Sequence, residues 1–132
     1  MGREATLLGP FTPSIQGGPA AADAAIGTGA SAVIAHNDLL AIGALRRFAE
    51  RGVTVPDDIS VVGFDDIFGA DFCAPPLTTV SGPLEAVGRT AVDLVLSSLQ
   101  KAGRTATQQL RAPAHLVIRS STGPAPERDL RT

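Results

Sequence analysis

The sequence predicts an α/β protein: three layers, with a parallel sheet flanked by helices. Short apolar runs alternate with longer segments of helical periodicity, which is the order of βαβ units. The run from Ile59 to Phe64 is apolar without regular alternation, as in a strand covered on both faces. It stops at Asp65 and Asp66. Ligands of open parallel sheets bind beyond the carboxyl ends of the strands, so these carboxylates mark a candidate site.

The composition is that of one small globular domain. The chain has 132 residues, of which 44% are hydrophobic and 18% charged. A net charge of -2 lacks the basic footprint of a nucleic-acid-binding surface. Cys73 is the single cysteine, so an intramolecular disulfide is excluded. No leader peptide and no apolar run near the ~20 residues of a membrane span are recognised, so a cytoplasmic location is expected.

The first half of the chain is expected to form three strands and two helices. Residues 9–19 are rich in glycine and proline and predict a loop. Asn37 precedes a segment of 3.6-residue periodicity, and Gly52 follows it at the position of a helix stop. The predicted elements are a strand at 5–8, a helix at about 19–28, a strand at 31–35, a helix from Asn37 to about Arg51, and a strand at 59–64.

The second half is expected to hold one long helix and three short strands. Pro83 suits the first position of a helix reaching about Ala102. Apolar residues recur along it at helical spacing. The stripe consists of Leu84, Val87, Gly88, Ala91, Val92, Val95 and Leu99. Before and after this helix we expect a turn or broken helix at 66–77, strands at 78–80, 107–111 and 115–118, and a frayed tail at 124–132.

Two polar pairs follow predicted strands, and each has two interpretations. Asn37 could face a ligand, but asparagine is also a common helix N-cap, and Asp38 favours the positive end of a helix. One of Asp65 and Asp66 could cap the following turn. Paired carboxylates also suit hydroxyl-rich ligands such as sugars. A Mg²⁺ site of the phosphoryl-receiver kind is rejected, because the only lysine, Lys101, lies near a helix terminus.

The remaining motifs do not indicate catalysis. Gly27-Thr28-Gly29 resembles a nucleotide-binding glycine pattern but precedes a strand instead of following one. His36 and His115 are far apart in sequence, and Cys73 has no neighbouring base. No enzymatic activity, cofactor or metal is therefore expected.

Three segments together resemble the lactose-repressor/galactose-repressor (LacI/GalR) family of bacterial transcription regulators. The first is Ala35-His36-Asn37-Asp38-Leu39-Leu40-Ala41-Ile42-Gly43-Ala44. The second runs from Gly52 to Asp66 and contains the sequence VPDDISVVGFDD. The closing segments are PPLTTV at 75–80 and LVIRSSTG at 116–123.

The resemblance implies an effector-binding core of the periplasmic-binding-protein type I fold, of which this chain would be one incomplete subdomain spanning residues 1–123. Such cores bind small effectors, often sugars, in a cleft between two subdomains. The matching positions imply effector contacts for Asn37 and Asp65, with Asp66 beside them. They also imply a dimer face containing Ile42, Phe72 and Cys73.

The chain also departs from the family pattern. Family members are more than twice as long, and neither their helix-turn-helix nor most of their first subdomain is recognised here. DNA contact would come only through that absent domain. In the family the helix at 83–102 packs on the first subdomain. We therefore expect this helix to pack on its own α/β unit or to exchange with a second copy.

The sequence thus predicts a weakly sugar-binding effector portion of a LacI-family regulator, dimeric and without a membrane association. Two alternatives stay open. One is a fragment of a periplasmic-type solute-binding protein, and the other is a dimerisation module.

Overall fold

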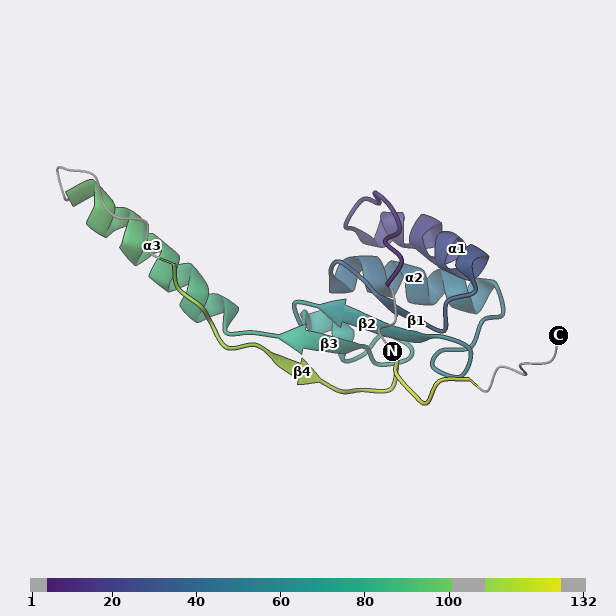
Figure 1. The fold of residues 1–132 in the computed structure, drawn as a ribbon. Helices are drawn as coiled ribbons and strands as arrows, with labels where there is room; N and C mark the ends of the chain where they lie inside the picture. The colour runs from purple at the N-terminus through teal and green to yellow at the C-terminus, as the bar shows by residue number, and fades with distance from the viewer. Residues whose placement is uncertain (1–4, 101–108, 127–132) are drawn as a thin grey trace.

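The computed structural model describes residues 5–100 and 109–126. Its sheet has four strands in the order β1-β2-β3-β4 (Figure 1). They are β1 (Ala32–Ile34), β2 (Ser60–Phe64), β3 (Thr78–Ser81) and β4 (His115–Val117). The first three are parallel, and β4 runs antiparallel to β3. The predicted α/β class and parallel sheet are confirmed, with an antiparallel edge strand added.

Two helices cover one face of the sheet (Figure 1). Helix α2 (Asp38–Glu50) packs on β2, and helix α1 (Gly18–Thr28) packs on α2. Short 3-10 turns precede α1, at η1 (Ile15–Gly17), and follow β2, at η2 (Phe68–Ala70). Among the described residues no helix is long and apolar enough to cross a lipid bilayer.

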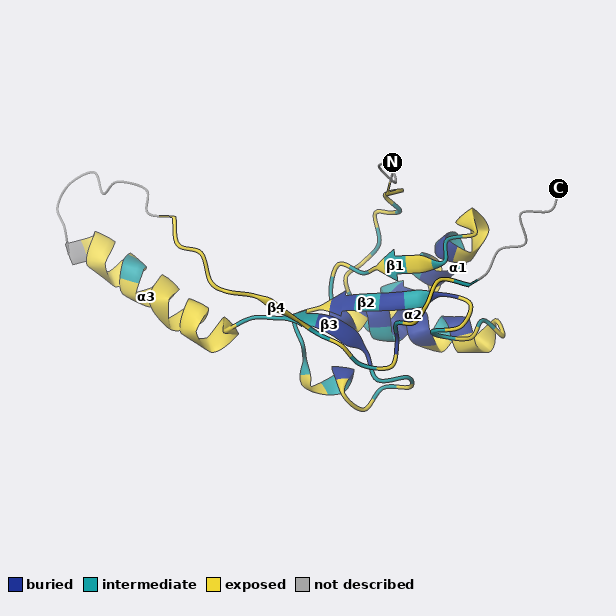
Figure 2. Ribbon diagram, turned by 60° about the horizontal axis from the view of Figure 1, so that its bottom comes forward, coloured by how far each residue is buried: buried dark blue, intermediate teal, exposed yellow. Residues whose placement is uncertain are grey.

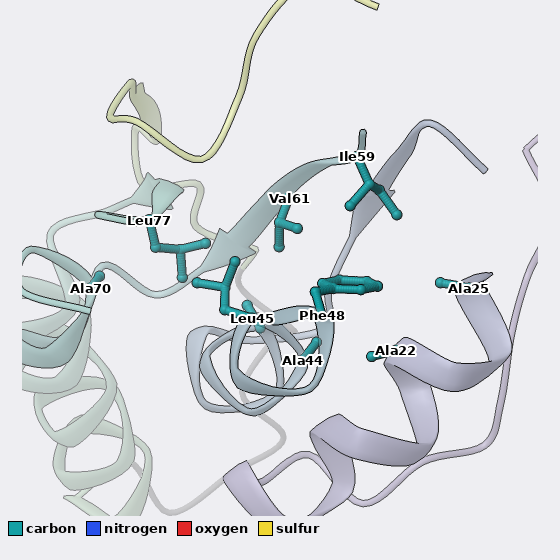
Figure 3. Packing of buried hydrophobic residues seen from close by; sticks show 10 residues of the cluster. Ala22, Ala25, Ala44, Leu45, Phe48, Ile59, Val61, Ala70 and Leu77 are labelled. Atoms are coloured by element: carbon teal, nitrogen blue, oxygen red, sulfur yellow. The ribbon is translucent and has the colours of Figure 1, made fainter. Parts of the chain in front are cut away.

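The core lies between α2 and the strands. Phe48 and Leu45 of α2 face Ile59 and Val61, and all four are almost fully buried (Figure 3). The alanines of α1 complete the cluster on the far side of Phe48 (Figure 3). This packing explains why the apolar periodicity of residues 38–50 predicted α2 correctly.

Helices α1 and α2 approach each other through glycine. A Cβ atom at Gly18 would lie 2.2 Å from the carbonyl carbon of Gly43, so neither backbone leaves space for a side chain. Ion pairs tie the outer surfaces of the two helices. The Asp23 carboxylate accepts hydrogen bonds from Arg47 at 2.9 Å and Arg51 at 2.9 Å, and Arg47 also pairs with Glu50.

Several predicted elements differ from the structure. Residues 5–8 form no strand, although Leu8 packs against the core. Four apolar or small residues beside a glycine and a proline predicted a strand, but no neighbouring strand pairs with them. Residues 109–111 of the predicted strand at 107–111 are not a strand, and 107–108 lie outside the described residues. Residues 124–126 of the predicted tail are irregular, and the rest of it lies outside the described residues.

The long helix α3 (Leu84–Gln100) does not form the third layer that the sequence predicted. It projects away from the sheet and does not pack extensively on any described element (Figure 1). A helix must cross the sheet only when it joins two parallel strands. Because β4 is antiparallel to β3, the chain returns to the edge that it left, and α3 need not cross. The expectation that both faces of β2 are covered is therefore wrong for the described chain, as is packing of α3 on its own unit.

Candidate functional site

A hollow of about 410 Å³ lies at the carboxyl ends of β1 and β2. His36 and Asn37 follow β1, Phe64 ends β2, and Asp65 follows it; these four residues line the hollow. Because β1 and β2 are parallel neighbours, their carboxyl ends meet at one edge of the sheet. The structure therefore brings together Asn37 and Asp65, as the sequence predicted, and adds His36 and Phe64 beside them.

Asn37 is the N-cap of α2. Its Oδ1 accepts a hydrogen bond from the backbone N–H of Leu40 at 2.9 Å, and its Nδ2 donates to the carbonyl of Pro13 at 3.2 Å. The capping interpretation is thus correct. An amide oxygen has two lone pairs and the amide nitrogen two hydrogens, so one acceptor and one donor position stay available toward the hollow.

Asp65 and Asp66 both have positive φ, at 107° and 53°. Such values are uncommon for residues other than glycine and cluster at functional sites. The turn is fixed by the backbone N–H of Asp65, which donates to the carbonyl of Val80 at 3.0 Å. The strained turn separates the two carboxylates, so that only Asp65 lines the hollow.

Asp66 forms an ion pair with Arg119, at 2.8 Å between Oδ1 and Nη2. The hydrogen bond from Arg119 lowers the pKa of Asp66. Arg119 also donates to the carbonyl of Leu77 and approaches the Asp71 carboxylate at 3.3 Å. This cluster ties the loop after β2 to the chain beyond β4. Sequence reasoning did not assign this partner to Asp66, because the two residues are far apart along the chain.

Asp38 is fully buried and was not predicted as more than a helix-end charge. Its Oδ1 accepts a hydrogen bond from the Thr79 hydroxyl at 2.6 Å, and its Oδ2 accepts one from the Ile67 backbone N–H at 2.9 Å. Gly63 makes room for it, since a Cβ there would lie 2.0 Å from Oδ1. Asp38 thereby positions the loop that carries Asp65, without lining the hollow.

The predicted dimer-face residues lie around η2. Phe72 is 66% exposed, and its ring stands edge-on to that of Phe68, with the ring centroids 4.8 Å apart. Ile42 is half-buried, and its Cδ1 would lie 3.3 Å from a Cβ at Gly69. Cys73 turns inward instead, because its Sγ donates to the carbonyls of Ala70 and Pro75, and burial raises the pKa of the thiol.

The hollow combines a carboxylate, an imidazole, an amide and an aromatic ring that is about half exposed. A few polar groups beside an aromatic surface can orient a ligand with hydroxyls on an apolar ring. Within the described residues no group of three or more histidine, cysteine, aspartate or glutamate side chains could hold a metal ion.

Residues 7–122 match the family described as periplasmic binding protein-like domain. The transcriptional regulator MalR of Streptomyces coelicolor is 42% identical over 113 residues, covering 86% of this chain and 33% of that protein. A LacI-family regulator from Enterococcus faecium, solved with bound ribose, superposes with a TM-score of 0.76 at 33% identity, over 90% of this chain and 43% of that one. The complex of the regulator CelR with cellobiose gives 0.74 at 33% identity, over 82% and 33%.

The fold and the site thus define a periplasmic binding protein-like domain. The chain belongs to the LacI family of transcription regulators. It spans about a third of the length of the curated relatives that it matches. Those relatives are named as transcription regulators, not as enzymes.

Proposed function

We propose that this chain is the effector-binding portion of a LacI-family regulator and that its hollow forms one wall of a sugar site. The single observation that carries the proposal is the convergence of Asn37, Phe64 and Asp65 on one hollow at the carboxyl end of the sheet. Two similar regulators have been solved with sugars, ribose in one and cellobiose in the other.

Each group has a defined role in this proposal. The Asp65 carboxylate accepts hydrogen bonds from sugar hydroxyls, and the Asn37 amide adds one donor and one acceptor. The Phe64 ring, 47% exposed, packs against the apolar face of a sugar ring. Asp66 is committed to Arg119 and holds the loop in place, so we no longer assign it a ligand contact. DNA contact would come through a helix-turn-helix unit that this chain does not supply.

Binding by this chain alone should be weak, because a single wall buries only part of a ligand. The test is a titration of the full chain with ribose and with cellobiose, followed residue by residue through amide chemical shifts. Shifts should concentrate at His36, Asn37, Phe64 and Asp65. Asp65→Asn should weaken binding roughly 10- to 100-fold, since it removes charge-assisted hydrogen bonds.

Asp57→Asn is the matched control, because Asp57 is an exposed aspartate that does not line this hollow. It should leave the affinity unchanged. Shifts located elsewhere on the chain, or equal affinities for the two variants, would contradict the proposed site.

We further propose that Ile42 and Phe72 belong to a face that pairs with a second copy. The exposure of Phe72 and of its partner Phe68 supports this pairing. Cys73 contributes to the face only by supporting the backbone of the turn, because its thiol points inward.

A further inference from the structure

The chain leaves the sheet and returns to it at one point. Ser81 ends β3 and pairs with His115, the first residue of β4. The intervening segment, residues 82–114, is here called the arm, and it is described at 82–100 and 109–114. The arm contains α3 and extends away from the body (Figure 1).

Helix α3 carries an apolar face that nothing in the described chain covers. Nearly all of the helix is exposed (Figure 2). Leu84 and Val95 are each 58% exposed, and Leu99 is 77% exposed. The face repeats at helical spacing, and charged residues such as Glu85 and Arg89 lie beside it and pair with each other. Amphipathic helices of this kind normally bury their apolar side on another element.

The sheet has a matching uncovered surface, here called the outer face, on the side away from α1 and α2. Because side chains alternate along a strand, Ile34, Phe64 and Leu116 point outward when Val33, Val61 and Thr79 point inward. The strand register aligns the outward residues into a row across all four strands. The row consists of Ile34, Val62, Phe64, Val80 and Leu116.

Helix α3 and the outer face are therefore complementary in kind. The exposed fractions of Ile34, Phe64 and Leu116 are 82%, 47% and 53%. Sheets that are mostly parallel are normally covered by helices on both faces, and this sheet is covered on one. The missing component is an amphipathic helix, and the chain holds one that has no surface to pack on.

We propose that α3 of one copy packs on the outer face of a second copy, and that the exchange is reciprocal. Both ends of the arm are fixed at the Ser81–His115 pair, and the arm points outward from there. Covering its own outer face would require the arm to reverse direction at both ends. A second copy related by a two-fold axis can accept the extended arm without that reversal, as in domain swapping.

The size of the contact is sufficient for a specific interface. A helix of 17 residues is about 25 Å long and about 10 Å wide with its side chains. Two reciprocal helix-on-sheet contacts would bury on the order of 1,000 Å² of accessible surface, the amount that specific interfaces require. This inference does not depend on the proposed sugar site.

The test measures the mass of the full chain by analytical ultracentrifugation in a Phe72→Asp background, so that the aromatic face around η2 does not contribute. The Phe72→Asp chain should be a dimer. Adding Val95→Glu should weaken dimerisation at least about 100-fold, because a carboxylate would be buried unpaired on the outer face. Adding Ser97→Glu, which places the same charge on the opposite side of α3, should leave the dimer intact.

A mixing experiment identifies the two surfaces. Chains with Ile34→Lys and chains with Val95→Glu, both in the Phe72→Asp background, should each be monomeric alone. When mixed they should form heterodimers, since one of the two reciprocal contacts is then unaltered. Both substituted residues are exposed in a single copy, so circular dichroism should show an unchanged fold. A monomeric Phe72→Asp chain, equal behaviour of Val95→Glu and Ser97→Glu, or no heterodimer on mixing would overturn the proposal.

Discussion

Asp38 shows how one residue can position a site without touching it. Its carboxylate joins the start of α2 to β3 and to the loop after β2, through Thr79 and the Ile67 N–H. The loop in turn carries Asp65 into the hollow. The neighbouring Asn37 does two things at once, since it caps α2 and lines the hollow. Adjacent residues at one strand end thus divide structural and binding roles.

Replacing Asp38 should destabilise the fold more than any exposed aspartate would. Asp38→Ala leaves the Thr79 hydroxyl and the Ile67 N–H buried without their acceptor, which should lower the free energy of unfolding by about 2–4 kcal/mol. Asp57→Ala, at an exposed aspartate, should change it by less than about 0.5 kcal/mol. Urea unfolding followed by circular dichroism measures both. A loss below about 1 kcal/mol for Asp38→Ala would show that the buried carboxylate is not needed.

At the scale of elements, the contact between α1 and α2 depends on backbone proximity. Gly18 and Gly43 let the two helices touch, and Asp23 joins them from outside through Arg47 and Arg51. Sequence analysis found both helices, because their periodicity and end signals are local. It did not find the contact between them, because a glycine within a helix signals no partner.

Two glycines of α1 give opposite predictions. Gly18→Ala should lower the free energy of unfolding by about 1–3 kcal/mol, because its Cβ would overlap the backbone of Gly43 and push the helices apart. Gly27→Ala should raise it by about 0.5–1 kcal/mol, because a Cβ there meets nothing within 4 Å and alanine favours the helix. Thermal and urea unfolding of the two variants would measure the difference, and equal effects would refute the close-contact interpretation.

At the scale of the whole molecule, the described chain consists of a packed body and a projecting arm. The body holds the hollow and the core, and the arm holds the amphipathic α3 (Figure 1). Two carboxylate clusters stabilise the body at separate places. Hydrogen bonds from Arg47 and Arg51 lower the pKa of Asp23 to about 2, and the hydrogen bond from Arg119 lowers that of Asp66.

Acid should therefore destabilise the whole molecule in a defined range. A carboxyl group with a depressed pKa stabilises the folded state above its unfolded value and loses that contribution as the pH falls through its folded value. For Asp23 this range extends from 3.8 down to about 2. Urea unfolding at a series of pH values should show stability falling across it. The Asp23→Asn/Asp66→Asn chain should be less stable at neutral pH and should lose less on acidification, whereas parallel curves for the two chains would argue against these ion pairs.

The sequence by itself determined the α/β class, the positions of α1, α2, α3 and of the strands β1 to β4, and the meeting of Asn37 with Asp65. These follow from local periodicity, capping residues and the rule that parallel strands end at one edge. Tertiary structure decided that Asp66 pairs with Arg119, that Asp38 is buried, and that His36 and Phe64 join the hollow. It also decided that α3 leaves the sheet. Each of these depends on which distant segments pack or pair together, above all on the antiparallel return of β4, and hydrophobic periodicity carries no information about strand direction.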